Sequence, residues 1–328
     1  MRNAIVYAVF VLVFLSSAIH SYGWDETGHK ITAYIAWQRM TPDVREKVIK
    51  ILRSAPEDSQ LATFYLSYGS RTREARAREF FMIAATWPDI IKDNDFQTRF
   101  NKYAKNNSDW HYVNNFWTFK DGKAVPVEDM QPVGRILKKL GDFNQLIRSN
   151  ASDSEKAIAI AWLEHLIGDV HQPLHASARV NEYDPKGDRG GNAFLLTPKG
   201  TKRNEQDNLH SFWDGVVVRY MPNRDKCEFE YIEPIANDIF KHYPYEKMKD
   251  RLNPDKFDVW ADESLAIAMN VAYKDLKFGE KPSDKYTKKA FEIAQERLAL
   301  GGYRLGDLFN EVFGAPAAIK VPPIPANQ

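Results

Sequence analysis

The segment from Trp162 to His175 constrains this chain more than any other part of its sequence. His165 and Asp169 are four residues apart, so on a helix their side chains lie on one face and can reach a common cation or neighbouring cations. Pro173 must end that helix, because its ring excludes the helical hydrogen bond and restrains the residue before it. His175 can then turn back toward the same pocket. Taken alone, the segment also fits histidines that cap a helix and pair with carboxylates.

A second pair with the same spacing is formed by His210 and Asp214. One such pair on a helix surface usually makes only a solvated contact, but two pairs in one chain are stronger evidence for a shared site. Imidazole and carboxylate ligands suit zinc, and a carboxylate can bridge two ions and reduce their mutual repulsion. The same residue types recur in three further places: Trp24-Asp-Glu-Thr-Gly-His29, Trp87-Pro-Asp89 and Trp110-His111-Tyr112-Val113-Asn114. The sequence therefore predicts a clustered metal site.

Two of the histidines that follow residue 23 lie outside these motifs. His171 is off the helical face of His165, so we expect it to hydrogen-bond a neighbour of the ligands and not to bind a metal ion. His242 follows an amphipathic pattern next to Tyr243, which indicates an ordinary surface position.

Apolar residues recur at helical spacing through most of the chain after Trp24, whereas alternating patterns are scarce. We therefore predict an all-α fold, a single mainly helical domain with at most a small β-hairpin. The strand candidates are Asn114–Phe119 and Ala193–Leu196. Helices are expected near residues 31–37, 48–52, 72–85, 131–149, 154–171, 228–242, 259–276 and 284–313, with Gly301-Gly302 interrupting the last.

The first 23 residues have the pattern of a signal peptide. Arg2 provides the positive start, Ala4 to Ile19 form an apolar stretch that is short for a bilayer span, and Gly23 is a small residue at the expected cleavage point before Trp24. We expect cleavage there and no membrane anchoring afterwards, with export to the periplasm or the medium. An uncleaved membrane anchor is the alternative.

Net charge and cysteine content limit the kinds of partner and of crosslink. Removal of residues 1–23 takes away Arg2 and no acidic residue, which leaves 44 basic and 44 acidic side chains. A general basic surface for duplex DNA is therefore not evident. Cys227 is the single cysteine, so no disulfide can form within the chain, and metal ions are plausible internal crosslinks. Nothing in the composition marks a linker between domains.

Taken in order, the motifs resemble those of the type I zinc-dependent single-strand nucleases and 3'-nucleotidases, a family found in fungi, plants, protozoa and bacteria. The likeness extends from Trp24 to the Gly301–Leu305 segment. It is specific because nine ligand positions occur in the right order, and the absence of the disulfides of many fungal and plant members points toward a bacterial member. The motifs that carry it are Trp24 with Gly28-His29, Trp87-Pro-Asp89, His111, His165-Leu-Ile-Gly-Asp169, Gln172-Pro-Leu-His175, Gly190-Gly-Asn192 and Asn208-Leu-His210-Ser-Phe-Trp-Asp214.

The resemblance implies a nuclease domain over residues 24–314, with three zinc ions at the bottom of a cleft and a Pro-rich tail over residues 315–328. The first zinc ion would be held by Asp89, His111 and His165, with Asp169 bridging to the second. The second would take the α-amino group and carbonyl of Trp24 together with His29 and Asp169. The third would take His175, His210 and Asp214. Signal cleavage would then be an activation step, because only cleavage frees the amine of Trp24.

The implied chemistry is hydrolysis of phosphoesters. A water between two zinc ions loses a proton near neutral or mildly acidic pH, the resulting hydroxide attacks phosphorus in line, and the third ion stabilises the leaving 3' oxygen. Expected substrates are single-stranded DNA and RNA, which would yield 5'-phosphates, and 3'-nucleotides, which would yield inorganic phosphate. No stable protein partner is implied.

Three further residues take roles from the resemblance. Lys92 occupies the place of a basic residue that steadies the reacting phosphate near Asp89, although lysine is a point charge and not a bidentate fork. Tyr112 matches an aromatic residue that stacks on a base, and stacking favours single strands. It also fits a core aromatic. Asn114 stands where some members have an aspartate that bonds a base edge, so base preference does not carry over.

Two other functions compete with the nuclease. A zinc-dependent phospholipase C shares the N-terminal Trp and a three-metal site, but carries a Glu where Asp214 stands here. A catalytically silent protein, in which zinc only stabilises the helical fold, is the other. Asp89, Lys92 and Asp169 argue against it.

Overall fold

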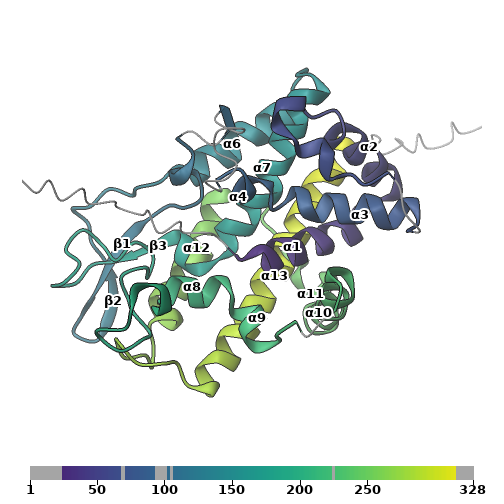
Figure 1. Ribbon diagram of the computed structural model, residues 1–328. Helices are drawn as coiled ribbons and strands as arrows, with labels where there is room; N and C mark the ends of the chain where they lie inside the picture. The colour runs from purple at the N-terminus through teal and green to yellow at the C-terminus, as the bar shows by residue number, and fades with distance from the viewer. Residues whose placement is uncertain (1–23, 68–70, 93–101, 104–105, 224–225, 315–328) are drawn as a thin grey trace, which may run out of the picture.

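The computed structural model describes residues 24–67, 71–92, 102–103, 106–223 and 226–314. These residues form a mainly helical fold, as expected, with the few strands gathered at one end and the helices α2 (Pro42–Leu52) and α3 (Arg73–Ala84) at the other (Figure 1). The predicted signal peptide and the Pro-rich tail lie outside the described residues. Within the described part of the chain, no helix has both the length and the apolar character needed to cross a bilayer.

Several of the helices begin with side-chain caps. Ser283 caps α13, and Ser152 caps α7 in a reciprocal box with Glu155. The helices are α1 (Glu26–Arg39), α2 (Pro42–Leu52), α3 (Arg73–Ala84), α4 (Trp87–Ile90), α6 (Ile136–Arg148), α7 (Asp153–His171), α8 (Leu209–Asp214), α9 (Val216–Tyr220), α10 (Glu228–His242), α11 (Tyr245–Met248), α12 (Phe257–Ile267) and α13 (Asp284–Phe313); the strands are β1 (Asn115–Lys120), β2 (Lys123–Pro126) and β3 (Ser177–Arg179).

Helix α7 is the buried centre of the fold. Every residue from Ala159 to His171 is buried, because α1, α2, α6, α12 and α13 all pack against this helix. A helix enclosed on all sides has no solvent face, so polar side chains on it must find partners inside the protein. The polar side chains of its C-terminal half are the predicted metal ligands and their neighbours.

Helix α13 runs unbroken from Asp284 to Phe313, so the predicted interruption at Gly301-Gly302 is wrong. The two glycines serve packing instead. A Cβ atom on Gly302 would lie 2.5 Å from Cβ of Ile35 on α1, which is closer than real atoms approach. The glycines therefore let the backbones of α13 and α1 come together, and these two helices form the most extensive helix contact in the fold.

The small sheet has the strand order β2-β1-β3 (Figure 1). Strands β1 and β2 form a hairpin whose turn residues Asp121 and Gly122 both have positive φ, as a two-residue type I′ turn requires. Strand β3 adds to β1 in parallel, a pairing that the sequence analysis did not foresee. The predicted strand at Ala193–Leu196 is wrong, because only one isolated bridge, between Leu195 and Asn208, forms there.

Two helix boundaries differ from the prediction for identifiable reasons. The helix expected from residue 131 begins at Ile136, because Val133 pairs with Asn114 and Gly134 adopts a φ of +118°. The helix expected over 259–276 stays α-helical only to Ile267 and continues as one π-helical segment to Ala272. The hydroxyl of Tyr286 donates to the carbonyl of Ala272 at 2.5 Å, a tertiary bond that no local pattern reveals.

The close contact between α1 and α13 makes a stability prediction. Gly302→Ala should lower the free energy of unfolding by about 1–3 kcal/mol, because the new methyl group overpacks Ile35. Gly141→Ala in α6 is the matched control, since nothing lies within 4 Å of its added Cβ. That substitution should stabilise by about 0.5–1 kcal/mol through helix propensity. Urea unfolding of both variants provides the measurement, and equal effects would contradict the packing explanation.

Candidate metal centre

The C-terminal half of α7 positions the centre of the site. His165 and Asp169 lie one helical turn apart and both are fully buried. The helix ends at His171, as Pro173 predicts, and the chain then forms a 3-10 turn over Pro173–Ala176 that turns His175 back toward Asp169. Nδ1 of His175 lies 3.9 Å from Oδ1 of Asp169.

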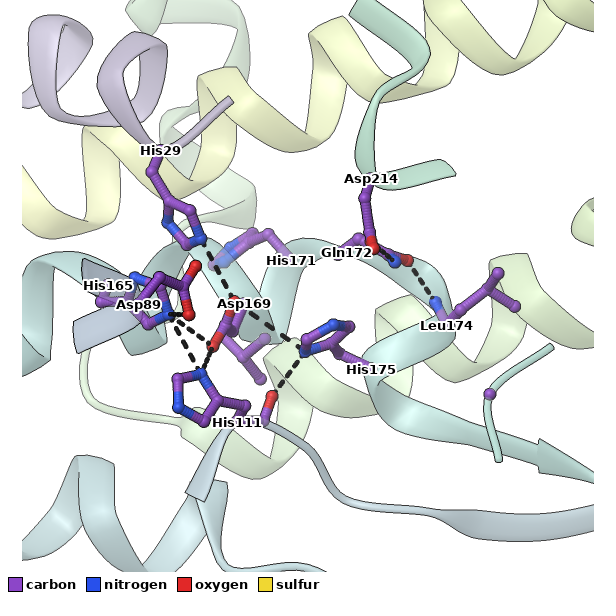
Figure 2. A network of polar contacts seen from close by, with 12 residues as sticks. His29, Asp89, His111, His165, Asp169, His171, Gln172, Leu174, His175 and Asp214 are labelled. Carbon is purple, nitrogen blue, oxygen red and sulfur yellow. Dashed lines mark hydrogen bonds and ion pairs between the residues drawn. The ribbon is translucent and has the colours of Figure 1, made fainter. Parts of the chain in front are cut away.

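The carboxylate of Asp169 is the hub of the site, with imidazole rings from four segments directed at it (Figure 2). Its Oδ2 lies 2.8 Å from Nδ1 of His111 and 3.3 Å from Nε2 of His165. Its Oδ1 lies 3.4 Å from Nε2 of His29 on α1. Although burial opposes ionisation, the charges and hydrogen bonds of the surrounding histidines hold the pKa of Asp169 well below its usual range.

Asp89, His111 and His165 form one group of possible ligands. Asp89 comes from the short helix α4, and its Oδ1 lies 3.6 Å from Nε2 of His165. Lys92, one turn later, donates from Nζ to the same oxygen at 2.9 Å. Burial alone would raise the pKa of Asp89, but the charges of Lys92 and of the neighbouring histidines together outweigh burial, and the pKa falls to about 2. Burial and Lys92 also lower the pKa of His111 to about 3, which leaves this imidazole neutral.

His29 forms a second group of possible ligands with His165 and Asp169. The rings of His29 and His165 stack with their centroids 3.9 Å apart. Both ring nitrogens of His29, Nε2 of His111 and Oδ1 of Asp169 are buried and lack a hydrogen-bond partner. Buried polar atoms of native proteins are nearly always satisfied, so these atoms indicate a ligand that binds among them.

His175, His210 and Asp214 form the third group. His175 donates from Nδ1 to the carbonyl of His111 at 2.5 Å, and His210 donates from Nδ1 to the carbonyl of Gly190 at 2.7 Å. A carbonyl only accepts, so Nδ1 of each ring carries a proton and Nε2 of each ring faces into the group. The two Nε2 atoms face one another at 3.1 Å, an arrangement that a shared cation would stabilise.

Asp214 adds a buried carboxyl group to the third group of possible ligands. Burial raises the pKa of Asp214 well above its usual value, and the nearby carboxylates of Asp25 and Asp169 raise it further. The Nε2 amide of Gln172 donates to Oδ1 of Asp214 at 2.6 Å (Figure 2). Oδ2 of Asp214 lies 3.6 Å from Nε2 of His210. One carboxylate oxygen is thus held by an amide and the other faces the imidazole.

The segment that begins at Trp24 reaches the same region. Trp24 is fully buried, and the next residue donates its backbone N–H to the carbonyl of Asp214 at 3.0 Å. The carboxylate of Asp25 caps α1 by accepting from the N–H of Gly28 at 2.9 Å. Burial raises the pKa of Asp25 to about 6. These contacts fix the main chain next to Trp24 between α1 and α8.

Tyr112 and Asn114 lie in the segment that follows His111. The ring of Tyr112 is half-buried and rests against Gly134, where an added Cβ would lie 2.8 Å from Cδ2 of the ring. Asn114 is half-buried and pairs through its backbone with Val133. Their placement near the three groups follows from the chain, because each is within three residues of His111.

Two residues with clear structural roles in the site were given no role by the sequence analysis. Gln172 bonds Asp214 and also accepts from the N–H of Leu174 at 2.5 Å, and the following proline was a signal for such a cap. Asp188 accepts from the N–H groups of Arg179 and Gly191 and from the hydroxyl of Tyr273, at 2.9, 3.1 and 2.6 Å. It thereby holds the turn whose Gly190 carbonyl orients His210.

The two remaining histidines behave as expected. His171 is fully buried, and Nδ1 of its ring donates to the carbonyl of Ile167 at 2.6 Å. His242 is exposed at the end of α10 and donates to the carbonyl of Asp238.

Comparison with known proteins gives a consistent result. The family model described as S1/P1 Nuclease matches residues 24–314. The chain is 23% identical to Endonuclease 2 of Arabidopsis thaliana over 323 residues, which cover 94% of this chain and 97% of that protein. It is 24% identical to Nuclease S1 of Aspergillus oryzae, over 92% of this chain and 96% of the other, and 23% identical to Nuclease P1 of Penicillium citrinum, over 90% and 100%.

The role of Asp188 makes a prediction. Asp188→Ala should lower the free energy of unfolding by about 2–4 kcal/mol, because it leaves two backbone N–H groups and the Tyr273 hydroxyl without their acceptor. Asp184→Ala in the same loop is the control, since that carboxylate accepts only a 3.2 Å bond from Asn181 among the contacts described for it. Thermal and urea unfolding distinguish the two, and a loss below 0.5 kcal/mol for Asp188→Ala, roughly that of a neutral surface substitution, would exclude this role.

Proposed function

Because the chain belongs to the S1/P1 nuclease family, we propose that it is an exported, zinc-dependent enzyme that hydrolyses single-stranded DNA and RNA to 5'-phosphates and also acts as a 3'-nucleotidase. The observation that carries the proposal is the pair of Nε2 atoms of His175 and His210, which face one another at 3.1 Å while carbonyls hold both Nδ1 atoms. Three groups of His and Asp side chains lie in this region, and within each group the possible ligand atoms are no more than 4.8 Å apart.

The donor chemistry fits zinc, which prefers imidazole nitrogen and carboxylate oxygen in sites with an open position. One ion would be held by Asp89, His111 and His165, with Asp169 bridging to a second ion. The second would be held by His29, Asp169 and the amine and carbonyl of Trp24, and the third by His175, His210 and Asp214. When bound, zinc supplies Lewis acidity that lowers the pKa of water toward neutrality and stabilises developing charge on phosphate oxygens.

Lys92 and Asp89 act together at the reacting phosphate in this proposal. The 2.9 Å bond from Lys92 to Asp89 fixes the ammonium group beside the ligands, and 7% of the lysine remains exposed. A preorganised cation at that point would stabilise the additional negative charge of the transition state. Asp89, with its pKa near 2, stays ionised at any pH where the enzyme would work.

Substrate selection would depend on local contacts, because the processed chain has no net charge. Tyr112 presents a half-buried ring next to His111, which suits stacking of one base, and Asn114 would bond a base edge. A base can stack on a side chain only when it has left its own helix, so this arrangement favours single strands. The proposed partners are substrates alone, with no stable protein partner.

Export would complete the site. The amine of Trp24 becomes a ligand only when residues 1–23 have been removed, so the signal peptide would keep the enzyme inactive until it reaches the periplasm or the medium. The cap that Asp25 forms on α1 supports this, because it holds the new terminus at the start of the helix that carries His29. The proposed nuclease domain spans residues 24–314, and the tail 315–328 lies outside the described part.

The first test is hydrolysis by the chain that begins at Trp24. We expect acid-soluble 5'-nucleotides from single-stranded DNA and RNA, loss of activity on chelation, and recovery with Zn²⁺. Inorganic phosphate release from 3'-AMP tests the nucleotidase activity. Duplex DNA and phosphatidylcholine are the comparison substrates. Hydrolysis of phosphatidylcholine alone would indicate a phospholipase C, and zinc binding without any phosphoester cleavage would indicate a structural metal site.

The second test concerns the terminal amine. One serine added before Trp24 converts the amine into an amide, and we expect about one zinc ion fewer per chain together with a fall in kcat of at least about 100-fold, comparable to removal of one electrostatic catalytic group. A serine added after Gln328 is the control. Atomic absorption and initial rates give the two readings, and full zinc content in the extended chain would exclude a ligand role for the amine.

A further inference from the structure

The metal-bearing end of α7 is held by side chains from two other helices. The last carbonyls of a helix have no partner within the helix and must find one elsewhere. Ser264 on α12 donates to the carbonyl of Val170 at 2.6 Å, and Nε of Arg297 on α13 donates to the carbonyl of His171 at 3.2 Å. Both acceptors directly follow Asp169 in the chain, so these bonds fix the turn that carries the hub carboxylate.

The ring of His171 links this turn to a second arginine. Nδ1 donates to the carbonyl of Ile167 at 2.6 Å, and Nε2 accepts from the guanidinium of Arg304 at 2.6 Å. A guanidinium only donates, so the ring must be neutral with its proton on Nδ1. Both nitrogens of His171 are therefore engaged inside the protein, on the face of α7 that does not carry His165.

Arg297 and Arg304 share the carboxylate of Glu263. Arg297 bonds Oε2 at 2.6 Å, and Arg304 bonds Oε2 at 2.9 Å and Oε1 at 2.8 Å. The trio has a net charge of plus one, because two guanidinium groups face one carboxylate. Only 1% of Arg297 and 3% of Arg304 are exposed, so the two positive groups are buried. That positive charge lies at the C-terminal end of α7, where the helix dipole is negative and favours a cation.

The spacing on α13 makes this arrangement possible. Arg297, Gly301 and Arg304 are four and three residues apart and lie on one face of the helix. A Cβ on Gly301 would lie 3.4 Å from Cγ of His171, so the glycine leaves the space that the imidazole fills between the two arginines. The neighbouring Gly302 receives Ile35 of α1, the helix that also carries His29. Helix α13 thus contacts both helices whose side chains meet at Asp169.

We propose that Arg304, together with Arg297 and Glu263, is a positioning residue of the metal centre that acts through His171. This inference rests on the proposed function, because it requires that metal ions bind at Asp169. The trio fixes the last turn of α7 in rotation and height, which places the Asp169 carboxylate between the imidazoles of His29 and His111. Without the trio, the last turn of α7 would still form, but its orientation relative to the other ligands would no longer be fixed.

A purely structural role would lower stability without a selective effect on the metal. The experiment therefore measures zinc affinity of folded protein, with the full chain exported and processed to Trp24. The variants are Arg304→Gln, Arg304→Lys, His171→Phe and the double variant Arg304→Gln/His171→Phe. Arg148→Gln is the matched control, because this arginine pairs at the surface with Asp255 and with Glu311 of α13 and makes no contact of this kind with α7.

The readings are the apparent dissociation constant for Zn²⁺ by competition with a chromogenic chelator and the visible spectrum of bound Co²⁺, both under conditions where near-ultraviolet circular dichroism shows native packing. We expect Arg304→Gln to weaken zinc binding about 10- to 100-fold, the range typical of partners that orient metal ligands. Arg304→Lys should lose less, and Arg148→Gln should match the wild type. The double variant should lose no more than the larger single effect, because both changes remove one contact.

Each outcome is decisive. Unchanged zinc affinity in folded Arg304→Gln, or additive losses in the double variant, would overturn the positioning role while the wild type still binds zinc. A wild type that binds no zinc would overturn this inference and the proposed function together. If Arg304→Gln does not fold, His171→Phe is tested by the same criterion, because it removes the contact from the other side.

Discussion

The buried carboxylate of Asp169 is the constraint to which the rest of the site conforms. It lies fully inside the protein and within 4 Å of four imidazoles that come from α1, α7 and two loops. An isolated charge in such a place would be strongly unfavourable, so the surrounding groups must compensate it. The histidines do so in part, and their remaining lone pairs define where positive ions would complete the compensation. Metal binding and correct packing of α7 would thus both serve to compensate the buried charge of Asp169.

Backbone carbonyls orient at least one imidazole in each of the three groups. The carbonyls of Ala85, His111 and Gly190 each accept from the Nδ1 of one histidine, which leaves Nε2 to face the site. Such second contacts determine the tautomer and raise the basicity of the ligand. Because these carbonyls lie outside the long helices, the segments that carry them must themselves be fixed by other contacts. Asp188 does this for the Gly190 turn, and Gln172 does it for the turn after α7.

The sequence predicted the elements, and the clustering of candidate ligands, where the signals are local. The i, i+4 spacing of His165 and Asp169, the helix stop at Pro173 and the limits of α10 and α13 all follow from neighbouring residues. The errors arose where distant contacts decide. Gly301-Gly302 suggests a break in isolation, but in the fold it admits Ile35 of α1. The parallel pairing of β3 with β1 and the π-helical segment before Tyr273 likewise depend on partners far along the chain.

The distribution of the ligands also links folding to metal content. The three groups draw on segments from His29 to Asp214, and each contains residues that are far apart in the sequence. An ion bound to such a group closes long loops of chain, as a disulfide would in a protein that had paired cysteines, and its binding energy adds to the folding energy. Cys227 cannot contribute such a link within the chain. Two of the three groups include residues of α7, so the helix with the buried carboxylate would also join two of these loops. In this proposal, order in the last turn of α7 would affect metal affinity and fold stability together, and an orientation-specific measurement would separate the two effects.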